Sequence, residues 1–73
     1  MYILEEVTLE YDELESLRLA DFLAYSHEES AKEMNISRAT FGRILENARR
    51  KVADSIINGK AIRINDGQLL KTK

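Results

Sequence analysis

Side chains that can read DNA bases gather in the segment from Arg38 to Asn58. Arg43 can donate two hydrogen bonds to guanine O6 and N7, and Asn47 can pair in a similar way with adenine. Ala39 and Thr40 are small enough for close approach and can contact a thymine methyl group. On a helix these side chains point away from the apolar face. The segment therefore predicts a helix whose N-terminal part lies in the major groove of double-stranded DNA.

A second set of side chains suits the phosphate backbone, whose contacts position a protein without reading sequence. Ser37 can cap the helix and donate to a phosphate at the helix N-terminus. Basic residues with an expected phosphate role are Lys32, Arg38, Arg49 and Arg50. The alternative is that Arg43 and Arg50 only solvate the helix, with Glu46 pairing to Arg50 four residues on. Asn47 lies far enough along the helix that it can miss the bases.

Two helices joined by a tight turn would position these residues. Ser26 and Glu29 form a capping box, which predicts a helix from His27 to Met34. The run Asn35-Ile36-Ser37 breaks that helix, because Asn tolerates the left-handed conformation and Ser37 caps the next helix, while Ile36 can fill the gap between them. The next helix is expected from Arg38 to Asn58.

Apolar residues recur along that helix at the spacing of one face. The expected core positions are Phe41, Ile44, Leu45, Ala48, Val52 and Ile56. The helix would extend about 31 Å at 1.5 Å per residue, which is longer than DNA reading requires. Gly59 is the expected C-cap. The second half of the helix must therefore have another role.

An N-terminal helix should complete a three-helix core. Met1 to Val7 is rich in strand formers and is expected to hold a short strand. Thr8 is the expected cap of a helix from Glu10 to about Phe22. Acidic residues in its first turn suit the positive end of the helix dipole.

A short β addition is expected after Gly59. The alternating stretch Ala61 to Ile64 predicts a strand, and Asp66-Gly67 is a hairpin turn signal that would bring Gln68 to Leu70 back against it. Two strands alone are marginal, so the addition needs either Tyr2 to Leu4 from the same chain or a second chain. A homodimer built by the second half of the long helix and the C-terminal strands is favoured, because Ile57 interrupts the polar side of the helix.

The composition limits the class of protein. With 73 residues and no cysteine, the chain is expected to be one domain over residues 1–73 without disulfide or zinc-thiolate bonds. Its net charge of −2 hides an asymmetry: 9 acids face 1 base before Ala31, and 10 bases face 4 acids from Ala31 onward. No apolar run is long enough to span a bilayer, so a cytoplasmic protein is expected.

Catalysis finds little support in the residue types. His27 is the single histidine, and Ser26 beside it is better used as a cap. There is no glycine-rich phosphate loop and no paired-histidine motif. We therefore expect no enzymatic activity and no cofactor.

The chain resembles a known family in several runs of residues. These runs are residues 17–21, Ser26 to Ala31, Met34 to Arg38, Thr40 to Asp54 and Gly59 to Ala61. They resemble the uncharacterised protein family 0251, also called domain of unknown function 134. The resemblance implies an all-α, three-helix domain with a helix-turn-helix similar to region 4 of sigma-70 factors. It further implies sequence-specific double-stranded DNA binding and a role in transcription regulation. An adaptor that binds other proteins through the same fold is the alternative.

Overall fold

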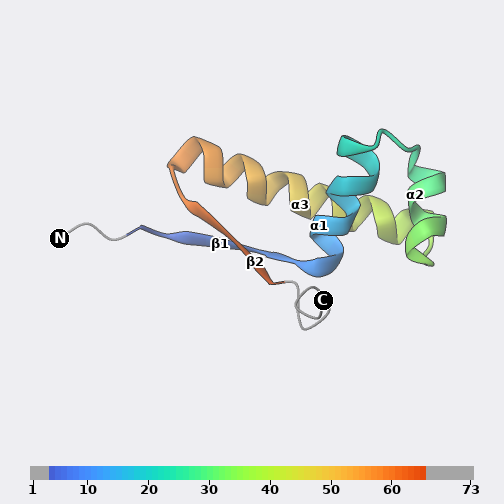
Figure 1. Cartoon of the computed structure of the whole chain (residues 1–73), viewed down its shortest axis with the longest axis horizontal. Coiled ribbons are helices and arrows are strands. Elements are labelled where there is room, and N and C mark those ends of the chain that lie inside the picture. Colours follow the sequence, from blue (N-terminus) through green and yellow to red (C-terminus); the bar gives the residue numbers. More distant parts are fainter. Residues whose placement is uncertain (1–3, 66–73) are drawn as a thin grey trace.

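The computed structural model describes residues 4–65, in which three α-helices, one π-helical turn and two strands follow one another along the chain. The order is β1 (Glu6–Glu10), α1 (Tyr11–Leu17), the π-helical turn η1 (Arg18–Phe22), α2 (His27–Met34), α3 (Arg38–Asn58) and β2 (Ala61–Asn65). The chain is thus mostly helical with a small two-stranded sheet. Helix α3 runs the length of the molecule, with α1, η1 and α2 around its first half and both strands along its second half (Figure 1).

The two strands pair in parallel, with Val7 opposite Ile62 and Leu9 opposite Ile64. The predicted strand at Ala61 to Ile64 is therefore confirmed, and its partner is β1. A strand within Met1 to Val7 is wrong in its placement, because β1 begins at Glu6 and includes Thr8. The hairpin turn at Asp66-Gly67, the returning residues 68–70 and the strand partners Tyr2 and Ile3 lie outside the described residues.

The start of α1 also differs from the prediction. Glu10, rather than Thr8, is the N-cap, and its backbone N–H donates to Glu13 Oε1 at 2.9 Å. Thr8 cannot cap the helix because it is paired in β1. The helix ends as a π-helical turn at Phe22, close to the expected end. Leu19 is 1% exposed whereas Phe22 is 82% exposed, so the wider turn directs Leu19 into the core.

A buried contact joins β1, α1 and α3. Lys51 Nζ donates to the Thr8 carbonyl and to Glu13 Oε1, both at 2.8 Å. The Glu13 side chain is almost fully buried, and its Oε1 also accepts the N-cap hydrogen bond. The second half of α3 therefore holds the sheet in place, which accounts for much of its length.

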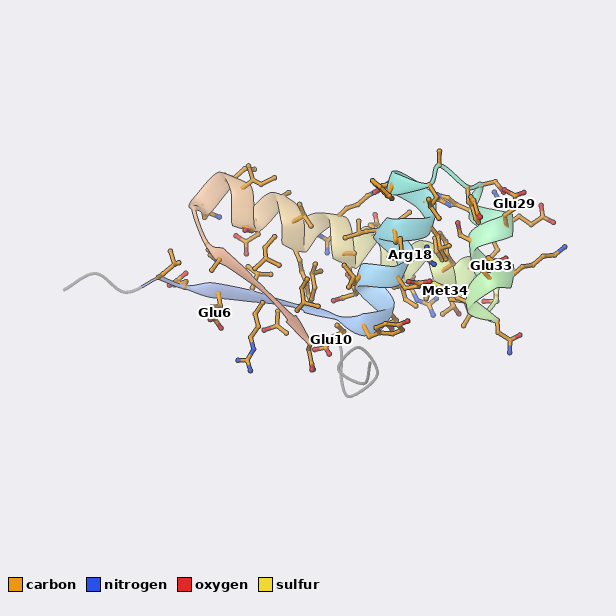
Figure 2. The ribbon with its side chains drawn as sticks, viewed as in Figure 1. Glu6, Glu10, Arg18, Glu29, Glu33 and Met34 are labelled. Carbon is orange, nitrogen blue, oxygen red and sulfur yellow. The ribbon has the colours of Figure 1, made fainter. Side chains whose placement is uncertain are left out.

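The side chains of β1 divide between the two faces of the sheet. Val7 and Leu9 are buried, whereas Glu6 and Glu10 lie on the side away from α3 (Figure 2). Ile56, an expected core residue of α3, is 74% exposed, because the core of that helix ends at Ser55. None of the helices within residues 4–65 is long and apolar enough to cross a bilayer.

Candidate nucleic-acid interface

The turn between α2 and α3 forms as its sequence predicts. Ser26 Oγ accepts the Glu29 N–H at 3.1 Å and completes the capping box of α2. Asn35 ends α2 in the left-handed conformation at φ 60°. Ser37 then caps α3 by accepting the Thr40 N–H at 3.1 Å. These local bonds fix where α3 begins relative to α2.

An aromatic anchor holds the first turns of α3 against the rest of the domain. Phe41 is fully buried and packs with Leu45 and Ala31. The His27 ring meets the Phe41 ring edge-on, with centroids 5.4 Å apart. Ile36 packs against this cluster from the turn, as expected. The opposite side of α3 is consequently directed outward.

The predicted reading residues lie on that outward side. Ala39, Arg43, Asn47 and Arg50 are exposed and, at 3.6 residues per turn, fall within an arc of about 80°. Thr40 borders this arc and is partly buried. Ser37, Arg38 and Lys32 are also exposed, around the start of the helix. From Ala39 to Arg50 this face is about 17 Å long, so the structure brings Ala39, Arg43, Asn47 and Arg50 together on one side of α3. Arg38 lies about 100° away from this arc and Lys32 belongs to α2, so neither is on the same face.

The basic residues of the described chain divide into two groups. One group has acidic partners within 4 Å, as in the pairs Arg18–Glu15, Arg49–Asp21, Lys51–Glu13, Lys60–Asp54 and Arg63–Glu6. The other group makes no ion pair with any residue of the described range and comprises Lys32, Arg38, Arg43 and Arg50. All four belong to the predicted site. Their positive charge is therefore not offset by a contacting acid.

Arg49 does not share this position. Its guanidinium donates to both carboxylate oxygens of Asp21, at 3.1 and 2.7 Å. This hydrogen bonding lowers the pKa of Asp21 and raises the pKa of Arg49. Sequence reasoning assigned Arg49 to phosphates and missed its partner, because the two residues are 28 positions apart and no local signal links them. Arg49 instead attaches η1 to α3.

The hydroxyl groups at the start of α3 have distinct hydrogen-bond roles. Ser37 Oγ accepts the Thr40 N–H and donates to Thr40 Oγ1 at 2.9 Å. A hydroxyl has one proton, so Ser37 has none left for a phosphate in this arrangement. This bond between Ser37 and Thr40 does not use the Thr40 hydroxyl proton. Thr40 is consequently the better phosphate or base donor of the two, and Ser37 is the cap.

Little in the described chain suits metal binding. No group of three or more His, Cys, Asp or Glu side chains among residues 4–65 is arranged to hold a metal ion. An open groove with a volume of about 820 Å³ runs along α1 and η1, and its lining includes Tyr11, Leu14, Phe22 and the Arg18–Glu15 ion pair.

Comparison with known proteins places the chain among uncharacterised relatives. The family model described as "Protein of unknown function DUF134" matches residues 2–72. A UPF0251 protein of Desulfosudis oleivorans is 56% identical over 70 residues, which cover 96% of this chain and 51% of that protein. A UPF0251 protein of Prosthecochloris aestuarii is 54% identical, with 93% and 44% covered. One from Methanococcus maripaludis is 55% identical, with 88% and 49% covered.

The chain spans about half the length of these curated relatives. No solved structure matches it significantly.

Proposed function

The chain belongs to the DUF134 family of proteins of unknown function, and we propose that this domain binds double-stranded DNA in a sequence-specific manner. The first half of α3 lies in the major groove and reads the base sequence. The α2–turn–α3 unit acts as a helix-turn-helix of the kind found in sigma-70 region 4. Such a domain suits a regulator of transcription.

The proposal depends mainly on four basic residues that make no ion pair within residues 4–65. These residues are Lys32, Arg38, Arg43 and Arg50, and none of them has an acidic partner among residues 4–65, although this part of the chain contains many Asp and Glu residues. Phosphates release condensed counterions when they meet such side chains, which gives most of the non-specific affinity for DNA. Arg43 and Asn47 then supply direct base readout, with Ala39 and Thr40 in close approach.

A protein-binding adaptor is a second candidate, favoured by the apolar groove on α1 and η1. Tyr11 and Phe22 are exposed there, next to an acidic stretch. This groove lies on the first helical segments, whereas the four unpaired bases lie on α2 and α3. The two functions would therefore use different surfaces and can be tested separately.

Titration of a fluorescent 30-base-pair random duplex at low salt tests the proposal. We expect micromolar or tighter binding that salt weakens steeply. Arg43→Ala should weaken it, and Arg49→Ala, which removes a base already paired with Asp21, is the matched control. Binding that is absent at low salt would contradict the DNA-binding proposal and leave the adaptor function. An equal loss from both substitutions would contradict the assignment of Arg43 to the interface.

A further inference from the structure

The two outer edges of the small sheet differ in how their backbone groups are satisfied. The Ala61 N–H donates to the Glu5 carbonyl at 2.9 Å. This bond determines which residues of β2 direct their backbone groups to β1. In a parallel pair, alternate residues of each strand direct their backbone groups to the partner. Ala61, Arg63 and Asn65 therefore face β1, and Ile62 and Ile64 direct their N–H and C=O groups away from it.

The outer edge of β1 is covered at its C-terminal end, by Lys51 and Glu13. The Thr8 carbonyl accepts from Lys51 Nζ at 2.8 Å, and the Glu10 N–H donates to Glu13 Oε1 at 2.9 Å. Residues 4–65 offer no such partner to the backbone groups of Ile62 and Ile64. Native proteins cover or charge free edges because they pair readily with other strands. Within residues 4–65, β2 thus has the less covered edge of this sheet.

Apolar side chains surround this edge of β2. Ile62 and Ile64 share the α3 side of the sheet with Val7 and Leu9, yet they are 42% and 45% exposed. Lys51 lies at the β1 edge of the sheet. Viewed along the axis of α3, Ile56 lies about 140° from Lys51, so it is on the side of the helix toward β2. Strands of parallel sheets are normally covered on both faces. An apolar strip therefore accompanies the free backbone groups.

We propose that β2 pairs antiparallel with the β2 strand of a second copy, which makes a four-stranded sheet across a two-fold axis at Arg63. In this register Ile62 lies opposite the partner's Ile64, and each such pair exchanges two hydrogen bonds between groups that face outward. A two-fold contact requires a patch that complements itself. The alternation of β2 meets that requirement, because the same two residues carry the free backbone groups and the exposed apolar side chains.

The charges at this edge also favour a second copy over a strongly charged partner. Arg63 lies on the polar face of the sheet and pairs with Glu6 at 3.9 Å. Asn65 donates to Glu10 on the same face at 2.9 Å. The two Arg63 side chains meet near the axis with a Glu6 beside each, so the contact is close to neutral.

Molar mass and amide exchange of the 73-residue chain test this proposal without DNA. We expect light scattering to give twice the monomer mass as the concentration rises to hundreds of micromolar. Exchange of the Ile62 and Ile64 amides should slow with concentration, whereas that of the Arg63 amide, which faces β1, should not change. A monomer at all concentrations overturns the proposal. Slow exchange of Ile62 and Ile64 in the monomer means that the chain covers its own edge, which also overturns it.

Two substitutions separate the edge from the fold. Ile64→Pro removes an outward N–H and no bond to β1, so it should raise the dimer dissociation constant by at least about tenfold while circular dichroism stays unchanged. Should that variant unfold, Ile56→Glu gives the same test on α3, with Phe22→Glu as the control for an equally exposed apolar residue away from the sheet. Ile56→Glu should reduce the dimer and Phe22→Glu should not. A dimer unaffected by Ile56→Glu would contradict this interface. The result is independent of whether the domain binds DNA.

Discussion

The salt dependence of DNA binding provides a quantitative test of the proposed interface. Four basic residues make no ion pair within residues 4–65, namely Lys32, Arg38, Arg43 and Arg50. Each basic side chain that neutralises a phosphate contributes about −0.9 to the slope of the logarithm of the binding constant against the logarithm of the salt concentration. If all four do so, the slope is about −3.6. The affinity of one protomer should then fall roughly 150-fold between 50 and 200 mM salt.

Single substitutions should divide this slope in a predictable way. Arg50→Ala should bring it to about −2.7, because one phosphate contact is lost for every sequence. Arg43→Ala should in addition cost about 1–3 kcal/mol on the preferred site, since a bidentate guanine contact is worth that much. Arg49→Ala should leave the slope unchanged, because the Arg49 guanidinium already neutralises Asp21.

The assay is fluorescence anisotropy of a labelled duplex at five salt concentrations from 50 to 300 mM, with the protein kept below its self-association range. The order of slopes carries the test, since it compares variants that differ by one arginine. Equal slopes for Arg50→Ala and Arg49→Ala would refute the assignment of Arg50 to a phosphate and of Arg49 to Asp21. A slope near zero for the parent would refute the phosphate contacts altogether.

Three predictions concern the scaffold. Phe41→Ala empties a fully buried aromatic site and should cost about 3–5 kcal/mol, so a thermal melt should find the variant largely unfolded. Asp21→Asn removes an exposed ion pair and should cost under about 1 kcal/mol at neutral pH. The pKa of Asp21 is lowered in the folded state, so its contribution is lost as pH falls below the usual carboxyl range, and melts of parent and variant should converge in acid. Gly42→Ala on α3 meets no atom within 4 Å and should raise stability by about 0.5–1 kcal/mol.

Local signals in the sequence specify the α2–turn–α3 unit in full. Ser26, Asn35, Ser37 and Gly59 each act within a few residues of their own position, through a side-chain cap or a left-handed backbone. The bounds of both helices follow from these residues and are confirmed. The predicted core of Phe41 and its neighbours is confirmed for the same reason, since the helix register fixes which side is buried.

The β part was predicted only in part, because the strand at Ala61 to Ile64 has a local pattern whereas its pairing depends on contacts between distant residues. β1 and β2 are more than 50 positions apart, and nothing near Thr8 indicates that it pairs with Arg63 rather than capping a helix. The turn signal at Asp66-Gly67 favoured a local partner, which lies outside the described residues, whereas the partner within residues 4–65 is parallel and remote. The bidentate Arg49–Asp21 pair belongs to the same class of contact. No local pattern links Arg49 to Asp21, so the sequence led to an expected phosphate role for a residue that already has an acidic partner.

The two proposals can be linked by a single variant. Ile64→Pro acts at the outer edge of β2, in a different element from the reading residues of α3. We expect it to leave the salt slope per protomer unchanged, because Lys32, Arg38, Arg43 and Arg50 keep their surroundings. A dimer brings two reading helices to half-sites about one helical turn, or roughly 34 Å, apart or a multiple of that distance. Tethering then raises affinity without a new contact, so the variant should lose affinity only for duplexes that carry both half-sites. An equal loss on a single half-site would mean that the sheet edge contacts DNA directly, because linkage cannot act where only one protomer is bound.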